Sequence, residues 1–218
     1  MSAPLYIVRH GETVYNRAAR MQGRQPHTPL TRAGMRQAEA MGRRLRAELG
    51  ARPDIDLWCS TAGRARQTMA LICDILECDY FSVRFDDRLV EIDVAGWTER
   101  HYHEIEAEIG PFVDQARQLY TRFPEGGEDY QAIARRVDDW LKARDPHRAA
   151  LVVSHGMTGR VLRGLLVGGD GAPAMPADAP QGTIFRIRDG REERIGPAAR
   201  DGLAGLKRGD AGVFKPRY

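Results

Sequence analysis

Three short runs of apolar residues constrain the fold of this chain more than any other feature of its sequence. They span residues 5–8, 57–59 and 149–153, and each is apolar throughout instead of alternating with polar residues. Strands that are covered by helices on both faces of a mostly parallel sheet have this pattern. The three runs therefore predict buried strands that pair in parallel.

Helical patterns lie between and after these runs. Thr31 stands where the N-cap of a helix is expected, and apolar residues recur over 35–49 with the spacing of one helix face. Three further stripes of this kind follow within residues 65–76, 130–141 and 161–166. Because strands and helices alternate, we predict an α/β fold with a mostly parallel central sheet and helices on both faces.

The pattern loosens between residues 93 and 127. This stretch holds several glycines and prolines, including Gly126-Gly127, and its helical patterns at 102–109 and 112–123 are weak. An irregular segment between regular elements is typical of a functional insertion. We therefore predict a small inserted lid over about 93–127.

The C-terminal part shows simpler signals. Residues 171–180 have the composition of a loop, and Asp189-Gly190 predicts a tight turn between two strands. Residues 196–218 are rich in glycine and charge, which indicates a C-terminal arm or tail. Residues 1–195 are then expected to form a single domain that includes the lid.

Composition and charge argue against several classes of protein. The chain has 218 residues and a net charge of +3, which is too small and too dispersed to favour a nucleic-acid partner. No apolar run is long enough to span a membrane, and no secretory signal is visible. The three cysteines lack C-x-x-C spacing, which argues against a disulfide framework or a zinc site. We expect a cytoplasmic protein without membrane or nucleic-acid partners.

Residues suited to chemistry follow each apolar run closely. Arg9 and His10 follow the first run, Arg64 comes shortly after the second, and His155 comes just after the third. Ligands of open α/β sheets bind beyond the carboxyl ends of the strands, so these side chains are expected to converge. If Thr61 caps the next helix, Arg64 lies in its first turn, where a cation is unfavourable unless an anion binds there.

A phosphoryl group is the anion that these residues fit best. The guanidinium forks of Arg9 and Arg64 match phosphate oxygens, and a neutral imidazole can attack phosphorus. Nearby arginines lower the pKa of a histidine below its reference value of about 6.5 and keep a nucleophilic nitrogen free. Gly11 and Gly156 allow a phosphate to approach the backbone closely. These residues together predict phosphoryl transfer at this edge of the sheet.

Residues 5–16 (LYIVRHGETVYN) resemble the signature of the histidine phosphatase superfamily, which has the phosphoglycerate-mutase-like fold. Further blocks of the family pattern follow in the family's order, up to about residue 190. These blocks are RMQG at 20–23, PLT at 29–31, STAGRARQT at 60–68, LVEI at 89–92, GW at 96–97, GGE at 126–128 and VSHG at 153–156. A lone Arg-His-Gly is a weak signal, but this ordered set is a strong one.

The resemblance implies a role for each candidate residue. His10 matches the nucleophile that becomes a phosphohistidine, and Glu91 matches the proton donor. The other matches are Arg9, Arg64 and His155 around the phosphoryl group, Asn16 as a phosphate-contacting amide, and Gln22 and Gly23 in a substrate-facing loop. No metal is required in this scheme, because arginines and histidines supply the electrostatic stabilisation. We accordingly expect no metal ligand and no cofactor.

The identity of the acid rests on a choice between two glutamates. Glu99, in the sequence ERHY, resembles the acid-bearing stretch of the mutases. We assign the role to Glu91 because RLVEI at 88–92, with GW just after, fits the phosphatase pattern better. The chain departs from the family at His27, where aspartate is common, and at Thr61-Ala62, where Pro-Leu is common. Both departures lie outside the phosphate pocket and concern loop shape and substrate choice.

Three functions stay open on the sequence. The first, which we favour, is a phosphatase that hydrolyses a small phosphorylated metabolite. The second is a phosphoglycerate mutase that depends on 2,3-bisphosphoglycerate as cofactor, although the chain lacks the longer insertions typical of the mutases. The third is a homologue that binds a phosphorylated ligand without turnover. A homodimer is compatible with each of them.

Two weaker hypotheses concern further ligands. Arg17, Arg20 and Arg24 follow the nucleophile and would favour a second anionic group on the substrate, although ordinary exposed arginines are an equal explanation. A metal site at His101 and His103 has little support, because HEIE at 103–106 is not H-E-x-x-H and no third ligand is evident.

Overall fold

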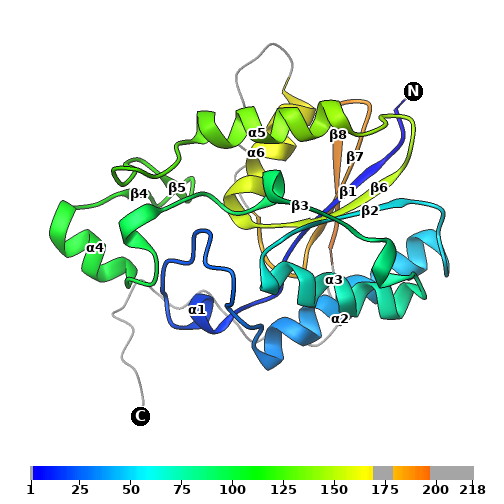
Figure 1. Ribbon diagram of the computed structural model, residues 1–218, viewed down its shortest axis with the longest axis horizontal. Coiled ribbons are helices and arrows are strands. Elements are labelled where there is room, and N and C mark those ends of the chain that lie inside the picture. The colour runs from blue at the N-terminus through cyan, green and yellow to red at the C-terminus, as the bar shows by residue number, and fades with distance from the viewer. Residues whose placement is uncertain (1, 169–178, 197–218) are drawn as a thin grey trace.

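The computed structural model describes residues 2–168 and 179–196 and has the predicted α/β architecture (Figure 1). Six strands form the central sheet in the order β3-β2-β6-β1-β7-β8. The three apolar runs form β1 (Leu5–Arg9), β2 (Asp56–Ser60) and β6 (Ala150–Ser154). β6 lies between β1 and β2 and pairs in parallel with both, as predicted.

The two edges of the sheet differ in direction. At one edge, β3 (Arg84–Asp86) pairs in parallel with β2. At the other edge, β7 (Ile184–Arg188) pairs antiparallel with β1, and β8 (Arg191–Ile195) pairs antiparallel with β7. Asp189 and Gly190 have φ angles of 48° and 72°, the left-handed conformation that a two-residue hairpin turn requires. The hairpin prediction is confirmed.

Two pairs of helices cover the two faces of the sheet (Figure 1). α2 (Arg32–Leu49) and α3 (Gly63–Leu76) lie on one face, and α5 (Tyr130–Ala143) and α6 (Gly156–Val167) lie on the other. Successive residues of a strand point to opposite faces, so each buried strand contributes to both layers. In β1, for example, Tyr6 and Val8 pack with α2 and α3, whereas Leu5 and Ile7 pack with α5 and α6.

Capping side chains fix the start of two of these helices. Thr31 caps α2 as predicted, and Asp129 caps α5 in the same way, each by accepting a backbone hydrogen bond. The predicted cap of α3 is wrong, because Ala62 occupies the N-cap position. The Thr61 hydroxyl instead donates a hydrogen bond to Asp87, on the loop after β3.

The segment predicted as a lid contains one helix and one small hairpin. The helix predicted over 102–109 is α4 (Tyr102–Ile109). The helix predicted over 112–123 is wrong, since β4 (Val113–Asp114) and β5 (Leu119–Tyr120) form a hairpin there. The Asp114 carboxylate accepts the backbone N–H groups of Ala116 and Arg117 in the turn between the two strands.

Aromatic side chains join the lid to the layer under α5 and α6. Phe112 has its ring 5.0 Å from that of Trp97 and 5.9 Å from that of Tyr120, measured between centroids. These rings belong to the same buried cluster as Trp140 of α5 and Val161 of α6. The lid is therefore held by the hydrophobic core of the sheet domain.

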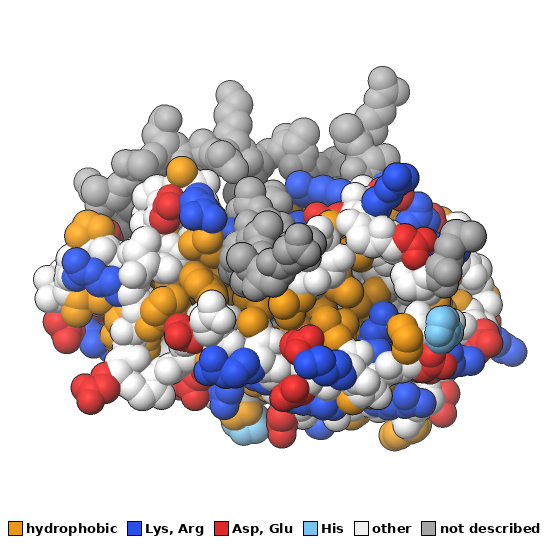
Figure 2. All heavy atoms as spheres, turned by 90° about the horizontal axis from the view of Figure 1, so that it is seen from above, with side chains coloured by type: hydrophobic (Ala, Val, Ile, Leu, Met, Phe, Trp, Pro, Cys, Tyr) orange, Lys and Arg blue, Asp and Glu red, His pale blue; other side chains and the backbone are white. Residues whose placement is uncertain are grey.

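Short elements complete the described chain. They are α1 (Val14–Arg17) and the 3-10 helices η1 (Tyr80–Ser82), η2 (Asp87–Leu89) and η3 (Ala95–Trp97). Charged side chains of both signs are interspersed on the face shown in Figure 2, which agrees with the small net charge. The loop predicted at 171–180 lies outside the described residues except for its last two, and the tail predicted at 196–218 lies outside them except for Gly196.

Candidate active site

The ends of β1, β2 and β6 bring two histidines and an arginine together. The rings of His10 and His155 meet edge to face, with centroids 5.1 Å apart and an interplanar angle of 64°. Arg64 Nε lies 3.3 Å from His10 Nε2. None of the three side chains is more than 2% exposed. The convergence that the sequence predicted is confirmed.

Hydrogen bonds determine which nitrogen of His10 carries its proton. Nδ1 lies 2.7 Å from the carbonyl oxygen of Gly11, which can only accept, so Nδ1 is the donor. Nε2 then keeps its lone pair and accepts from Arg64 Nε. Burial, and after it the charges of Arg64 and Arg9, hold the pKa of His10 well below its usual value. His10 is thus a neutral imidazole whose unprotonated nitrogen faces Arg64.

Arg64 lies in the first turn of α3 and is fully buried. Its Nη1 donates to the carbonyl of Gln25 at 2.6 Å, and its Nη2 donates to the carbonyl of Gly23 at 2.7 Å. Burial lowers the pKa of Arg64 to about 10, which still leaves the guanidinium charged at neutral pH. The described residues give it carbonyl partners and no carboxylate partner, so the ion-pair explanation of this arginine fails and the anion-binding one is favoured.

Arg9 ends β1 and approaches the same point from the other side. Its Nη1 donates to the carbonyl of Ala179 at 2.8 Å. Its Nε is buried and has no hydrogen-bond partner among the described residues. Because a buried unpaired donor is costly, this N–H indicates that a ligand atom completes the site. A Cβ on Gly156 would lie 3.4 Å from both Arg9 Cζ and Glu91 Oε2, so glycine keeps this point uncrowded.

His155 is held by Ser60, a residue that the sequence reasoning did not assign. The His155 Nε2 lies 2.7 Å from Ser60 Oγ, and Ser60 Oγ accepts the backbone N–H of Ala62 at 3.3 Å. The serine oxygen has one proton and two lone pairs, so this contact fits either tautomer of His155, whose Nδ1 is a buried atom without a described partner. Burial, followed by the charge of Arg64, keeps the pKa of His155 well below its usual value. The block STAGRARQT contained the signal that could have identified Ser60.

The two candidate acids lie in different surroundings. The Glu91 carboxylate accepts the backbone N–H groups of Met157 at 3.2 Å and Thr158 at 3.1 Å, at the start of α6. It therefore lies beside Gly156 and close to Arg9. Glu99 instead accepts from the Tyr15 hydroxyl and the Gln25 amide in an exposed position. The geometry favours Glu91 as the acid.

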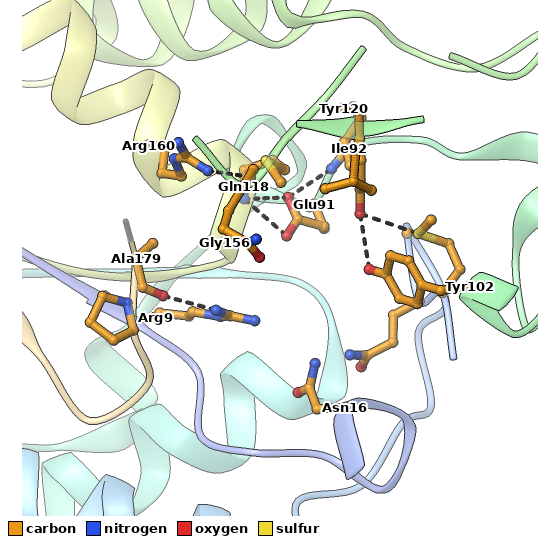
Figure 3. A pocket seen from close by; sticks show the side chains of 16 residues that line it. Arg9, Asn16, Glu91, Ile92, Tyr102, Gln118, Tyr120, Gly156, Arg160 and Ala179 are labelled. Atoms are coloured by element: carbon orange, nitrogen blue, oxygen red, sulfur yellow. Dashed lines mark hydrogen bonds between the residues drawn. The ribbon is translucent and has the colours of Figure 1, made fainter. Parts of the chain in front are cut away.

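A cavity of about 410 Å³ opens beside these groups (Figure 3). The predicted residues that line it are Arg9, Asn16, Gln22, Gly23, Glu91 and Gly156. His10, Arg64 and His155 do not line it, because they are buried next to Arg9 and Glu91. The residues of the lining that the sequence did not assign are Met21, Ile92, Tyr102, Val113, Gln118, Tyr120, Met157, Arg160, Ala179 and Pro180.

Thr13 orients the two amides that the sequence assigned to the substrate. Its hydroxyl donates to Gln22 Oε1 at 2.9 Å, and its backbone N–H donates to Asn16 Oδ1 at 3.1 Å. Asn16 Oδ1 also accepts from Gln181 at 2.9 Å. With the oxygens bonded in this way, the side-chain nitrogens are left to donate to a ligand, and Figure 3 shows that of Asn16 pointing into the cavity.

The lid side of the cavity carried little signal in the sequence. Tyr102, Gln118 and Tyr120 come from α4 and from the hairpin that was predicted as a helix. Arg160 comes from α6, one helical turn after Gly156, and this spacing could have identified it.

The described residues offer neither a cluster of metal-ligating side chains nor a membrane-spanning helix. No group of three or more His, Cys, Asp and Glu side chains in these residues could hold a metal ion. His101 and His103 have their ring centroids 5.1 Å apart, and His101 Nδ1 lies 3.0 Å from the carbonyl of Ala18. Within 2–168 and 179–196, no helix is both long and apolar enough to cross a lipid bilayer.

Comparison with known proteins identifies relatives over most of the chain. The model of the histidine phosphatase superfamily (branch 1) matches residues 5–193. A protein of Erwinia tasmaniensis named "probable phosphoglycerate mutase GpmB" is 35% identical over 198 residues, which cover 88% of this chain and 83% of that protein. The protein of the same name from Cronobacter sakazakii is 36% identical over 160 residues, covering 70% of this chain and 69% of that protein.

Solved structures agree with this family. A mycobacterial glucosyl-3-phosphoglycerate phosphatase superposes with a TM-score of 0.69 at 25% identity, covering 85% of this chain and 89% of that one. The alpha-ribazole phosphatase of Shigella flexneri superposes with a TM-score of 0.66 at 26% identity, covering 87% and 93%. The match over residues 5–193, together with the histidines and arginines at the strand ends, shows that this chain belongs to the histidine phosphatase superfamily, branch 1.

Proposed function

We propose that this chain hydrolyses a small-molecule phosphomonoester through a phosphohistidine on His10. The observation that carries the proposal is the state of that imidazole. Its Nδ1 proton is committed to the Gly11 carbonyl, and its pKa is held low by burial and by the charges of Arg64 and Arg9. Nε2 is therefore unprotonated at neutral pH, beside two cations that can hold a phosphoryl group, and it attacks once Arg64 Nε–H turns from Nε2 to a phosphoryl oxygen.

In the first step, His10 Nε2 forms a bond to phosphorus while the bond between phosphorus and the ester oxygen breaks. The guanidinium groups of Arg9 and Arg64 and the imidazole of His155 hold the outer phosphoryl oxygens as charge shifts onto them. Glu91, which is protonated in the complex with the phosphate dianion in this scheme, gives its proton to the leaving oxygen, so that a neutral alcohol departs.

In the second step, a water molecule attacks the phosphohistidine. Glu91, now a carboxylate, takes a proton from this water while the new oxygen–phosphorus bond forms and the nitrogen–phosphorus bond breaks. Inorganic phosphate leaves, His10 returns to its neutral form, and Glu91 holds its proton again. Protons and bonds balance over the cycle without an oxidant or a second co-substrate.

We further propose that the reaction needs neither a metal nor a cofactor, and that it takes place in the cytoplasm. Arginines and histidines are placed to supply the stabilisation that a metal would give elsewhere. The described cysteines, Cys59, Cys73 and Cys78, are free, as is usual in a reducing compartment. Hydrolysis of p-nitrophenyl phosphate should therefore continue undiminished in excess EDTA.

The covalent intermediate gives the direct test. After incubation with a phosphate-labelled ester and quenching in alkali, the wild type should carry an acid-labile label, and His10→Ala should carry none and show no turnover. His147→Ala, an exposed histidine on the loop before β6, is the matched control and should behave as the wild type. Undiminished turnover by His10→Ala would refute the mechanism.

A mutase is the second candidate, because curated relatives that are 35% and 36% identical carry that name. A mutase would return the phosphoryl group to another hydroxyl in place of water. The discriminating experiment measures isomerisation of 3-phosphoglycerate with 2,3-bisphosphoglycerate added, beside release of phosphate from p-nitrophenyl phosphate. We expect phosphate release to dominate.

A further inference from the structure

The cavity beside the phosphoryl pocket has two chemically different ends. Figure 3 shows Arg9 at one end and the pair Tyr102–Tyr120 at the other, with Glu91 and Gly156 between them. Glu91, as the proposed proton donor, has to stand next to the oxygen that leaves. The alcohol part of a bound ester therefore extends from Glu91 towards the two tyrosines.

The tyrosine end is walled mainly by apolar surface. Met21, Ile92 and Val113 line it together with the rings of Tyr102 and Tyr120. The two hydroxyls lie 3.0 Å apart, and that of Tyr120 donates to the sulfur of Met21 at 3.3 Å. Because these polar atoms are bonded to one another, the rings offer the cavity their apolar surfaces. Such a wall binds a flat or apolar group better than a strongly hydrated one.

Besides Arg9, Arg160 is the one cation in the described part of the lining. Its Nη1 donates to the backbone carbonyl of Gln118 at 2.6 Å, and its Nη2 donates to that of Arg117 at 2.7 Å. These bonds fasten the lid hairpin to α6. Both terminal nitrogens of Arg160 are therefore engaged by backbone carbonyls of the lid.

The arginines that the sequence offered for a second anion are placed elsewhere. Arg20 donates to the backbone carbonyl of Glu99, and Arg24 forms an ion pair with Glu128 at 2.7 Å. Neither Arg20, Arg24 nor Arg17 is among the described residues that line the cavity. The hypothesis that these arginines bind a second anionic group on the substrate has no support in this geometry.

We propose that the alcohol part of the substrate is an uncharged, ring-bearing group, and that small carboxylated esters are poor substrates. This inference rests on the proposed phosphatase function and names its substrate class. A cavity of about 410 Å³ falls within the range of roughly 300–1,000 Å³ of small-molecule sites and is far larger than a glycerate needs. Side-chain amides of Asn16 and Gln118 also line it and can donate to heteroatoms of such a ring.

Three esters with alkyl leaving oxygens of similar reactivity test the proposal. They are 2-phenylethyl phosphate, ethyl phosphate and 3-phosphoglycerate, each assayed by phosphate release. We expect kcat/KM for 2-phenylethyl phosphate to exceed that of either other ester at least about tenfold, because the ring fills the apolar end of the cavity. Equal values for the phenylethyl and ethyl esters, or preference for 3-phosphoglycerate, would overturn the substrate class.

Variants of lid residues test whether this wall of the cavity causes the preference for the phenylethyl ester over the ethyl ester. Tyr102→Ala should reduce the ratio of kcat/KM between the phenylethyl and ethyl esters about three- to tenfold, because it removes one ring surface. Val113→Trp, at a half-buried position, should reduce the same ratio by filling the cavity. Phe123→Ala is the matched control, an aromatic residue of the lid that packs on Tyr130 and does not line the cavity. Its ratio should equal that of the wild type.

Failure of the inference and failure of the function give different results. If a label appears on His10 and phosphate is released without preference for the ring, only the substrate class is wrong. If no ester is turned over and no label appears, the proposed function fails. Unchanged ratios in both Tyr102→Ala and Val113→Trp would also count against the assignment of this wall.

Discussion

The phosphoryl end and the lid end of the cavity differ in how they are built. His10, Arg64 and His155 are at most 2% exposed and follow strands that pair with one another in the sheet. Tyr102 and Val113 are only partly buried and stand on short elements whose register is set by local turns and aromatic packing. A group held by the sheet has one possible position, whereas the lid wall can change without disturbing the sheet. The reaction type is therefore a property of the first region, and substrate choice is a property of the second.

Removal of Arg64 gives the largest expected effect. Arg64→Met should lower kcat/KM by about a hundredfold to a thousandfold, because a charged donor to the transferring phosphoryl group is lost. The factor should be the same for ethyl and 2-phenylethyl phosphate, as the loss is at the phosphoryl end. Arg100→Met removes a half-buried cation near the lid, whose partner is Glu108, and serves as control. A loss confined to one of the two esters would break the distinction between the regions.

Glu91→Gln tests the proposed proton donor, which stands between the phosphoryl end and the lid end of the cavity. For ethyl phosphate, kcat should fall by about a hundredfold, because an alkoxide is a poor leaving group without a proton donor. For p-nitrophenyl phosphate the fall in the rate of the first step should be small, since the nitrophenolate leaves without a proton; burst kinetics measure that step. Glu99→Gln is the matched control and should treat both esters as the wild type does. A selective loss in the Glu99 variant would reverse the assignment of the acid.

Acid should destabilise the phosphoryl end through its two histidines. Burial lowers the pKa of His10 and of His155 in the folded protein, whereas in the unfolded chain each has a value of about 6.5. The unfolded state therefore binds more protons below that pH, and stability present above it is lost as the pH falls. Each histidine contributes a slope of up to about 1.4 kcal/mol per pH unit.

Urea unfolding at pH 7.5, 6.5 and 5.5 measures this loss. The His155→Gln variant should lose less stability between pH 6.5 and 5.5 than the wild type, because one of the two groups is absent. His103→Gln, an exposed histidine of the lid, should show the slope of the wild type. Equal slopes in the wild type and His155→Gln would show that this histidine is not held neutral by the fold.

The smallest expected effect concerns a residue that connects the two regions. Arg136 pairs with Glu128 at 3.0 Å and donates to the carbonyl of Arg88. It also donates to the hydroxyl of Thr158, whose backbone N–H bonds the Glu91 carboxylate. Arg136→Met should lower kcat for ethyl phosphate about fivefold through a displaced acid, with little change for p-nitrophenyl phosphate. Arg135→Met, on the exposed face of the same helix, is the control. Equal losses on both esters would assign Arg136 a general structural role in place of a positioning one.

Much of the phosphoryl end could be predicted from the sequence because its signals are local. A buried parallel strand is apolar throughout, and the residue after its end necessarily reaches the ligand edge of the sheet. His10 and His155 could be placed in this way from the order of their residues alone. Ser60 was missed because its partner His155 lies 95 residues further along the chain. Thr13 was missed because its bond to Gln22 depends on how the loop between them folds.

The lid could not be predicted equally well from local pattern. Residues 112–123 have a weak helical spacing, but the chain forms a hairpin because Asp114 bonds the turn and Phe112 and Tyr120 pack into the core of the main domain. That packing depends on α5 and α6, which are distant in sequence. The same holds for Arg160, whose hydrogen bonds to the hairpin carbonyls exist only after the lid has docked.

The sequence by itself determined the α/β architecture, the family resemblance and the convergence of cations and histidines, since strand periodicity and strand-end chemistry are encoded over a few residues. Only the tertiary structure decided which nitrogen of His10 is unprotonated, which glutamate faces the cavity and what surface meets the alcohol part of the substrate. Those properties depend on hydrogen bonds and burial between segments far apart in the chain, and no local pattern specifies them.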